Sequence, residues 1–263
     1  MTTTAYIDTH AHLDDERFDS DLDAVIARAA DAGVERIVCP AITADSSRKV
    51  VDLARAHSSL YAAVGIQPNY CGEAAPGDWD RVVALAGDQV VAIGETGLDR
   101  HWDFTPMEVQ QDYFDRHLRL AEELNLPVVI HCREAEEDVL PMLRETASRG
   151  PLRGVLHAFG GTRSLAEECL SLGLFVSFAG AVTYRNKKFE SLREVAAVVP
   201  EDRLLIETDS PYLTPHPLRG KEKRNEPARI VHTAAFLAEL RSTTVEALAA
   251  TTTANARRLF RLE

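Results

Sequence analysis

The sequence predicts an α/β fold, a (β/α)8 barrel of the TIM type, formed as one domain by residues 1–263 with extra helices at the C-terminal end. Three observations predict it. The length of 263 residues is close to the roughly 250 that such a barrel needs. Short β-rich runs alternate with longer amphipathic segments along the whole chain. No glycine-rich phosphate loop is found, which disfavours the alternative of an open, doubly wound sheet.

Eight runs have the character of strands. Several are almost continuously apolar, as expected for parallel strands that are covered on both faces. In chain order they are residues 5–10, 36–41, 60–66, 90–95, 127–132, 154–159, 174–180 and 204–209.

The segments between these runs have the apolar periodicity of helices. The clearest are residues 21–33, 106–125, 164–173 and 228–241. Gly33 suits the C-terminal cap of the first. We expect the second to have Thr105 as its N-cap and Pro106 in its first turn. We expect residues 243–263 to form two short helices that pack on the outside of the barrel.

Composition and charge limit the class of protein. The start of the chain lacks the basic and apolar regions of a secretory signal, and no run approaches the roughly 20 apolar residues of a membrane helix. The four cysteines are scattered, which indicates reduced thiols. We therefore expect a cytoplasmic protein, a monomer or small oligomer, with no membrane partner. The net charge of −12 disfavours nucleic acid binding unless basic residues cluster or metal ions supply positive charge.

Metal-ligating side chains stand at the ends of five predicted strands, where α/β barrels have their active sites. They are His10 and His12, Glu95, His131, His157, and Asp209. Residues two apart on a strand point to the same face, so His10 and His12 can reach one ion. Zinc and manganese accept imidazole and carboxylate ligands together.

This set predicts two divalent ions, zinc, manganese or magnesium. Glu95 has two oxygens and can bridge both ions, while His131 and His157 hold the second. Asp209 then lies beside the first ion and its water. Such a site keeps coordination positions open, which is typical of catalytic and not of structural metal sites. We expect none of the other five histidines to be a ligand, although His216 lies near enough to the rim to contact a substrate.

Six motifs in these places resemble those of the TatD family of metal-dependent deoxyribonucleases, a branch of the amidohydrolase-like barrels. They are DTHAHLD (8–14), AIGETGLD (92–99), VIHCRE (129–134), HAFGG (157–161), ETDSPYLTP (207–215) and RGKEKRNEP (219–227). The resemblance covers essentially the whole chain. It implies the same metal-binding roles and makes Asp209 and Glu95 the catalytic residues.

One position departs from the family's pattern. The family often has a histidine before the proline that follows the third strand, whereas this chain has Gln67 before Pro68. Glutamine donates and accepts hydrogen bonds but does not titrate near neutrality. We expect Gln67 to contact the substrate.

The first functional hypothesis is an exonuclease that cleaves DNA phosphodiester bonds with a water activated by two metals, Asp209 being the general base. Two basic clusters are expected to bind the substrate, at single-stranded or frayed ends. They are Arg185, Lys187 and Lys188 after the seventh strand, and Arg219, Lys221, Lys223 and Arg224 after the eighth. Tyr184 and Tyr212 could stack on a base or serve only in packing.

Two alternatives remain open from the sequence. The same metal site could attack an ester or amide carbonyl, as in a D-aminoacyl-tRNA deacylase or a small-molecule amidohydrolase, and Gln67 favours this reading. The other alternative is a non-catalytic scaffold that binds metal for stability.

Overall fold

The computed structural model describes residues 4–87 and 89–262, so the ends of the predicted domain, residues 1–3 and 263, lie outside it, as does residue 88. Eight parallel strands form one sheet in which each strand pairs with its neighbours in the sequence. They are β1 (Tyr6–Asp8), β2 (Val34–Pro40), β3 (Leu60–Val64), β4 (Val90–Asp99), β5 (Val128–Arg133), β6 (Gly154–Leu156), β7 (Phe175–Phe178) and β8 (Leu204–Ile206).

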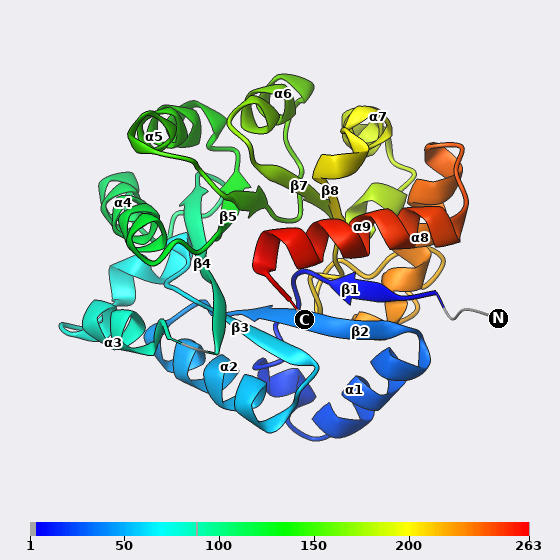
Figure 1. Ribbon diagram of the computed structural model, residues 1–263, viewed down its shortest axis with the longest axis horizontal. Coiled ribbons are helices and arrows are strands. Elements are labelled where there is room, and N and C mark those ends of the chain that lie inside the picture. The colour runs from blue at the N-terminus through cyan, green and yellow to red at the C-terminus, as the bar shows by residue number, and fades with distance from the viewer. Residues whose placement is uncertain (1–3, 88, 263) are drawn as a thin grey trace.

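The sheet curls into a barrel with helices around its outside (Figure 1), which confirms the predicted fold. The helices are α1 (Leu22–Asp31), α2 (Ala44–Ala56), α3 (Asp78–Leu85), α4 (Met107–Leu124), α5 (Glu136–Arg149), α6 (Arg163–Ser171), α7 (Glu190–Val198), α8 (Ile230–Leu240) and α9 (Val245–Phe260). Short 3-10 turns lie at Glu16–Phe18, Pro68–Glu73, Gly180–Thr183, Lys187–Phe189, Glu201–Arg203 and Pro227–Arg229. Within the described ranges, no helix has the length and apolar character needed to cross a membrane.

The ends of the predicted helices differ from the structure by only a few residues. Gly33 follows α1 with a φ of +89°, as its predicted capping role requires. The helix α4 begins one residue later than predicted, because Pro106 itself is the N-cap. The hydroxyl of Thr105 donates instead to the carbonyl oxygen of Asn69 and accepts from the backbone N–H of Gly72.

The barrel closes between β1 and β8 through the residues that follow these two strands. Ala11 and Ser210 form an isolated parallel bridge, and the N–H of His12 donates to the carbonyl oxygen of Ser210 over 2.7 Å. The N–H of Asp209 donates to the carbonyl oxygen of His10 over 2.9 Å. The seam of the barrel therefore runs through three of the predicted metal ligands.

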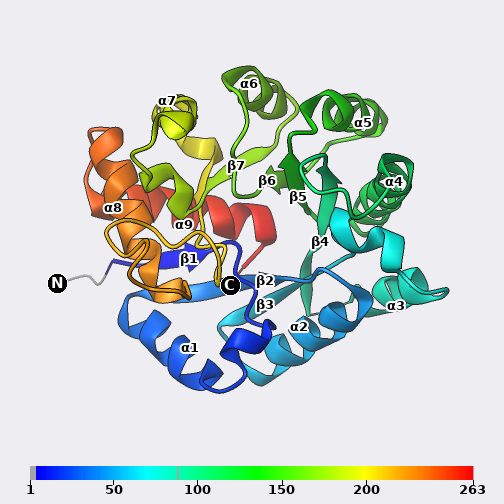
Figure 2. The ribbon, with the colours of Figure 1, turned by 180° about the vertical axis from the view of Figure 1, so that it is seen from behind.

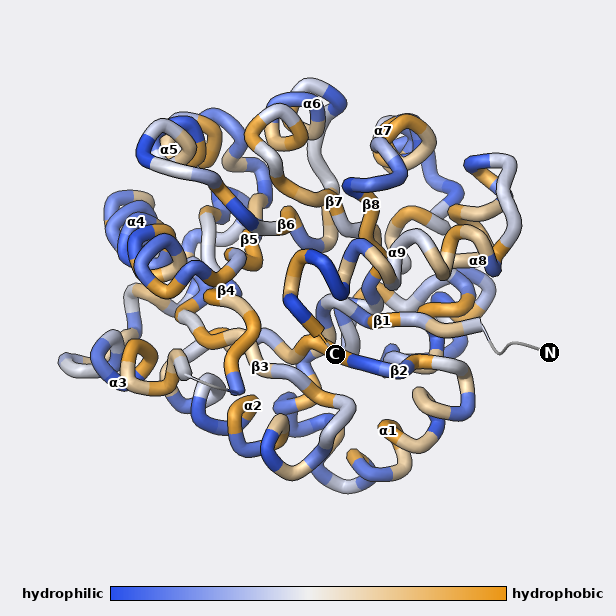
Figure 3. The backbone as a smooth tube through the Cα atoms, in the orientation of Figure 1, coloured by the Kyte–Doolittle hydropathy of each residue, from blue (hydrophilic) through white to orange (hydrophobic). Residues whose placement is uncertain are grey.

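The interior of the barrel has an apolar layer at the end opposite to His10, His12 and Asp209. Each strand contributes one buried side chain: Ile7, Val38, Ala63, Ala92, Val129, Val155, Phe175 and Leu205. Figure 3 shows hydrophobic residues along the strands, whereas hydrophobic and hydrophilic residues alternate around the outer helices.

The last helix closes this end of the barrel. Ala256, Leu259 and Phe260 of α9, followed by Leu262, pack against the interior layer. Figure 1 shows α9 crossing the front of the barrel, and Figure 2 shows the segment between β8 and α8 on the opposite side. The prediction of two short outer helices is therefore wrong. One continuous helix forms because its apolar side chains have the barrel interior to fill.

Candidate metal centre

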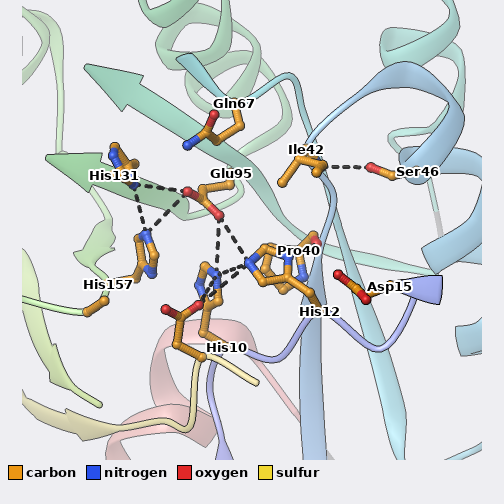
Figure 4. Close-up of polar contacts among 12 residues, drawn as sticks. His10, His12, Asp15, Pro40, Ile42, Ser46, Gln67, Glu95, His131 and His157 are labelled. Carbon is orange, nitrogen blue, oxygen red and sulfur yellow. Dashed lines mark hydrogen bonds and ion pairs between the residues drawn. The ribbon is translucent and has the colours of Figure 1, made fainter. Parts of the chain in front are cut away.

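Glu95 lies between two pairs of imidazoles, at the end of the barrel opposite to α9 (Figure 4). Its Oε1 atom is 3.1 Å from Nδ1 of His131 and 3.3 Å from Nε2 of His157. Its Oε2 atom is 3.3 Å from Nε2 of His10 and 3.5 Å from Nε2 of His12. Each oxygen of this buried carboxylate thus faces a different pair.

Asp209 completes the group around His10 and His12. Its Oδ1 atom is 3.7 Å from Nε2 of His10 and 3.6 Å from Nε2 of His12. The two Nε2 atoms are themselves 3.1 Å apart. Ligands that share one tetrahedral ion at about 2.0–2.1 Å are separated by about 3.3 Å, so these separations fit a divalent ion.

The structure brings all six predicted ligands together. Three overlapping groups have their ligand atoms within 4.8 Å of one another: His10 with His12 and Glu95, His10 with His157 and Asp209, and Glu95 with His131 and His157. Imidazole nitrogens and carboxylate oxygens in this number form a donor set that suits zinc or manganese. The residues present therefore fit a metal centre.

The carboxylates of the site are ionised. Burial alone would raise the pKa of Glu95, but the positive charge of His157 and a hydrogen bond from His10 hold this pKa well below its usual range. Burial would lower the pKa of His12, yet the hydrogen bond to Asp209 and the charge of Glu95 raise it to about 9. The pKa values of His131 and His157 are raised as well, by their neighbouring carboxylates, whereas burial lowers that of His10. A divalent ion would supply the positive charge that these buried carboxylates need.

A third carboxylate, Asp99, fixes the orientation of His131. Its Oδ2 atom accepts a hydrogen bond from Nε2 of His131 over 2.8 Å, and its Oδ1 atom accepts the backbone N–H groups of His101 and Trp102. Burial would raise the pKa of Asp99, but the hydrogen bond from His131 brings it to about 2. This leaves Nδ1 of His131 free for a metal.

Asp99 is not among the site residues predicted from the sequence, although a signal for it is present. Alternate residues on a strand share one face, so Asp99 lies on the same side as Glu95 once β4 is known to continue to residue 99.

Two further imidazoles have an acceptor near their outer nitrogen, and that of His12 makes a hydrogen bond with it, whereas that of His157 does not. Nδ1 of His157 lies 3.5 Å from Oε1 of Glu207, a fully buried carboxylate that also accepts the N–H of Ala158. Nδ1 of His12 lies 3.2 Å from the carbonyl oxygen of Pro40. Both rings therefore direct Nε2 toward the centre of the site, as metal-binding histidines usually do.

The backbone turns sharply at Asp209. Its φ of +54° lies in the left-handed region, which aspartate tolerates better than most residues. Together with the hydrogen bond between the Asp209 N–H and His10, this turn directs the carboxylate to the two histidines rather than along the strand.

Gln67 lies over Glu95 and His131 (Figure 4), and its contact with a substrate stays a prediction. It is buried, and its Oε1 atom accepts the backbone N–H of Asn69 over 2.8 Å. Because the oxygen is used in this way, the amide NH2 is the part that remains to donate to a bound molecule.

The predicted basic residues are placed in different ways. Arg185 and Lys221 are exposed on the loops after β7 and β8. The guanidinium of Arg219 lies 3.6 Å from the ring centroid of Tyr184, whose own side chain is buried, so Tyr184 serves in packing and is not available for stacking. Arg224 is bound to Asp21 by contacts of 2.7 and 2.8 Å, so the structure uses it to hold the loop before α1.

Comparison with known proteins identifies the relatives of this chain. The model of the family described as "TatD related DNase" matches residues 7–261. The chain is 43% identical over 256 residues to "Uncharacterized metal-dependent hydrolase YabD" of Bacillus subtilis (strain 168), covering 97% of this chain and 98% of that protein. It is 38% identical over 256 residues to "3'-5' ssDNA/RNA exonuclease TatD" of Shigella flexneri serotype 5b (strain 8401), covering 96% and 98%.

A solved structure has the same fold. The TatD homologue YjjV of Escherichia coli K12 superposes with a TM-score of 0.91 at 32% identity, and the match covers 100% of both chains. The fold and the site define a metal-dependent hydrolase, an enzyme built on a barrel. The chain belongs to the TatD family.

Proposed function

We propose that residues 1–263 form one domain that hydrolyses phosphodiester bonds at the ends of single-stranded nucleic acid, DNA in the first place, with two divalent ions. The observation that carries the proposal is the position of Glu95, whose two oxygens face two separate imidazole pairs. A relative named as a 3'-5' ssDNA/RNA exonuclease supports the choice of substrate. A cytoplasmic location would fit the free thiols of all four cysteines.

The six ligands divide between two ions in this proposal. His10, His12 and Asp209 would hold one ion, His131 and His157 would hold the other, and Glu95 would contribute an oxygen to each. Divalent ions in these positions would bind phosphate oxygens and lower the pKa of a coordinated water. Zinc and manganese suit the imidazole ligands best, and magnesium would depend on the carboxylates.

Asp209 is the proposed general base. Burial would raise the pKa of its carboxyl group, but the hydrogen bond from His12 and the charge of His10 lower it, so the group is ionised and able to accept a proton. Its side chain keeps 13% of its surface exposed, which leaves one side open to a water. The NH2 group of Gln67 would donate to a non-bridging oxygen of the substrate.

The rim offers positive charge despite the net charge of −12. Exposed cations stand on the loops after β7 and β8: Arg185, Lys187, Lys188, Lys221 and Lys223. Tyr212 is half exposed near His12, with ring centroids 6.1 Å apart, and Arg17 covers its ring at 4.5 Å. This small basic area suits the flexible end of a single strand better than a long duplex.

Ester hydrolysis is the second candidate, and Gln67 favours it. An amide donor in place of a titratable group suits attack on a carbonyl, where no strongly charged phosphate has to be held. A D-aminoacyl-tRNA or a small amide would then be the substrate of the same six ligands.

The test is hydrolysis of 3'- and 5'-labelled single-stranded DNA by metal-stripped protein after magnesium, manganese or zinc is restored. We expect metal-dependent release of nucleotides, lost in Glu95→Gln and Asp209→Asn and retained in the exposed control Asp202→Asn. A D-aminoacyl-tRNA is assayed at the same enzyme concentration. Faster turnover of this ester with no DNA digestion would overturn the nuclease proposal.

A further inference from the structure

Exposed aromatic side chains gather on the rim that surrounds the metal centre. Among the described residues, Trp102 and Phe104 are 45% and 63% exposed, and both lie on the loop between β4 and α4. Because β4 ends beside the site, this loop lies on the active-site rim of the barrel. Two large apolar rings in water at this place need a reason other than the core.

The two rings already form a stack. Their centroids are 5.4 Å apart and their planes differ by 5°. The guanidinium of Arg133 lies over the Trp102 ring, 5.6 Å from its centroid. A parallel pair of rings with a nearby cation is an arrangement that attracts flat, electron-rich groups.

The stack is tied to the metal ligands by short connections. The backbone N–H of Trp102 donates to Oδ1 of Asp99 over 3.0 Å, and the other oxygen of Asp99 holds His131. Arg133 follows His131 by two residues on β5, so both side chains leave the same face of that strand. The rings are therefore anchored beside the pair formed by His131 and His157.

We propose that Trp102 and Phe104 form a stacking platform for a nucleobase of the single strand bound at the metal centre, with Arg133 beside it. The proposal rests on the proposed nuclease function and adds how the strand is recognised. Every nucleobase has a π face, so such a platform binds single strands with little regard to sequence. A base in a duplex is already stacked and paired, so the platform also selects against duplex interiors.

Tryptophan fluorescence tests the platform directly. The chain has two tryptophans, and Trp79 packs against Tyr113 and His117 of α4. In the metal-loaded Trp79→Phe protein, only Trp102 emits. We expect saturable quenching by a phosphorothioate oligothymidylate, which resists cleavage, and no quenching by an oligomer of the same length that lacks bases. Equal quenching by both would overturn the proposal.

Variants supply the second measurement, anisotropy of a labelled oligothymidylate. Trp102→Ala and Phe104→Ala should each weaken binding by roughly 5- to 150-fold, the usual range for loss of one stacked base. Trp102→Phe should recover most of the affinity because it keeps a ring. Val198→Ala is the matched control, since Val198 is 53% exposed at the end of α7, on the opposite side of the barrel.

The outcomes separate the platform from the nuclease function. If the alanine variants bind and cleave single-stranded DNA with unchanged KM, the platform is wrong and the nuclease proposal stands. If the unmodified protein neither binds nor cleaves single strands in any metal, the nuclease proposal fails and the platform fails with it. Raised KM with unchanged kcat in both alanine variants, and the unmodified KM in Val198→Ala, would support the platform.

Discussion

Asp99 accepts a hydrogen bond from Nε2 of His131 over 2.8 Å, while Nδ1 of the same ring lies 3.1 Å from Glu95. One imidazole thus joins a buried anchoring carboxylate to the carboxylate at the middle of the site. The tautomer and the angle of this ring follow from Asp99, so a change there should reach the metal without removing any ligand.

Asp99→Asn should therefore weaken metal binding by about 10- to 100-fold, the usual effect of losing such an anchor. Titration of the stripped protein with zinc against a chelator of known affinity would measure it. Asp138→Asn is the control, because Asp138 holds Arg100 at the surface and touches no ligand. Equal zinc affinity in Asp99→Asn and the unmodified protein would show that His131 needs no anchor.

Metal content tests the division of ligands between two ions. Elemental analysis after dialysis should find two ions per unmodified chain and one in His131→Ala. The metal content of Glu95→Gln should be lower than that of the unmodified protein and that of His131→Ala, because the two oxygens of Glu95 face both imidazole pairs. His216→Ala, which removes a histidine outside the cluster, should keep both ions. A single ion per unmodified chain would show that the six residues share one metal.

His117 makes the stability of the protein depend on pH. It is fully buried, its Nε2 atom accepts the N–H of Ile66, and its Nδ1 atom donates to the carbonyl oxygen of Tyr113. Burial lowers the pKa of this imidazole from 6.5 to about 4. Between these values the unfolded chain binds a proton that the folded chain does not, so stability is full above pH 6.5 and falls as the pH drops toward 4. The loss is about 3 kcal/mol at most.

Urea unfolding of metal-free protein at pH 7.5 and pH 4.5 would measure this loss. His117→Gln keeps an acceptor and a donor but cannot titrate, so its free energy of unfolding should fall less than that of the unmodified protein over the same interval. Identical pH dependence in the two proteins would assign the acid sensitivity to other groups.

Gly97 allows β4 and β5 to approach each other next to the candidate metal centre. Its φ is +130°, and a Cβ atom there would overlap the carbonyl oxygen of His131. Gly97→Ala should lower the free energy of unfolding by about 1–3 kcal/mol and shift His131, which reduces metal affinity as well. Gly150→Ala is a suitable control, because its Cβ would meet only one side-chain atom at 3.8 Å. Unchanged stability and zinc affinity in Gly97→Ala would contradict this account.

The barrel and the meeting of the six candidate ligands at one rim could be predicted because their signals are local. Each strand is a short apolar run, and each candidate ligand stands at or near the end of such a run. Because the carboxyl ends of the strands of a barrel form one rim, these side chains are predicted to meet there. His10 and Asp209 lie on the first and the last strand, yet the rule for parallel strands places them together. The structure confirms this in the hydrogen bond between the two backbones.

The features that the sequence did not reveal depend on tertiary contacts. The predicted fourth strand ended at residue 95 because glycines are rare in strands, whereas β4 continues to Asp99 by pairing with β5. Arg224 looked like a substrate contact, and only the fold shows that Asp21 faces it. Nothing in the pattern of residues 243–263 indicated that the open end of a barrel would take up α9.

The seam between β1 and β8 has a consequence for the order of events during synthesis. His10 and His12 emerge from the ribosome early, but Asp209 and the strand that pairs with theirs come some two hundred residues later. Until then the two histidines lack Asp209 across the seam, and the barrel is not closed. In the proposed two-metal site, loading of the ion between His10, His12 and Asp209 would therefore come late in folding, and that ion would link the first strand to the last.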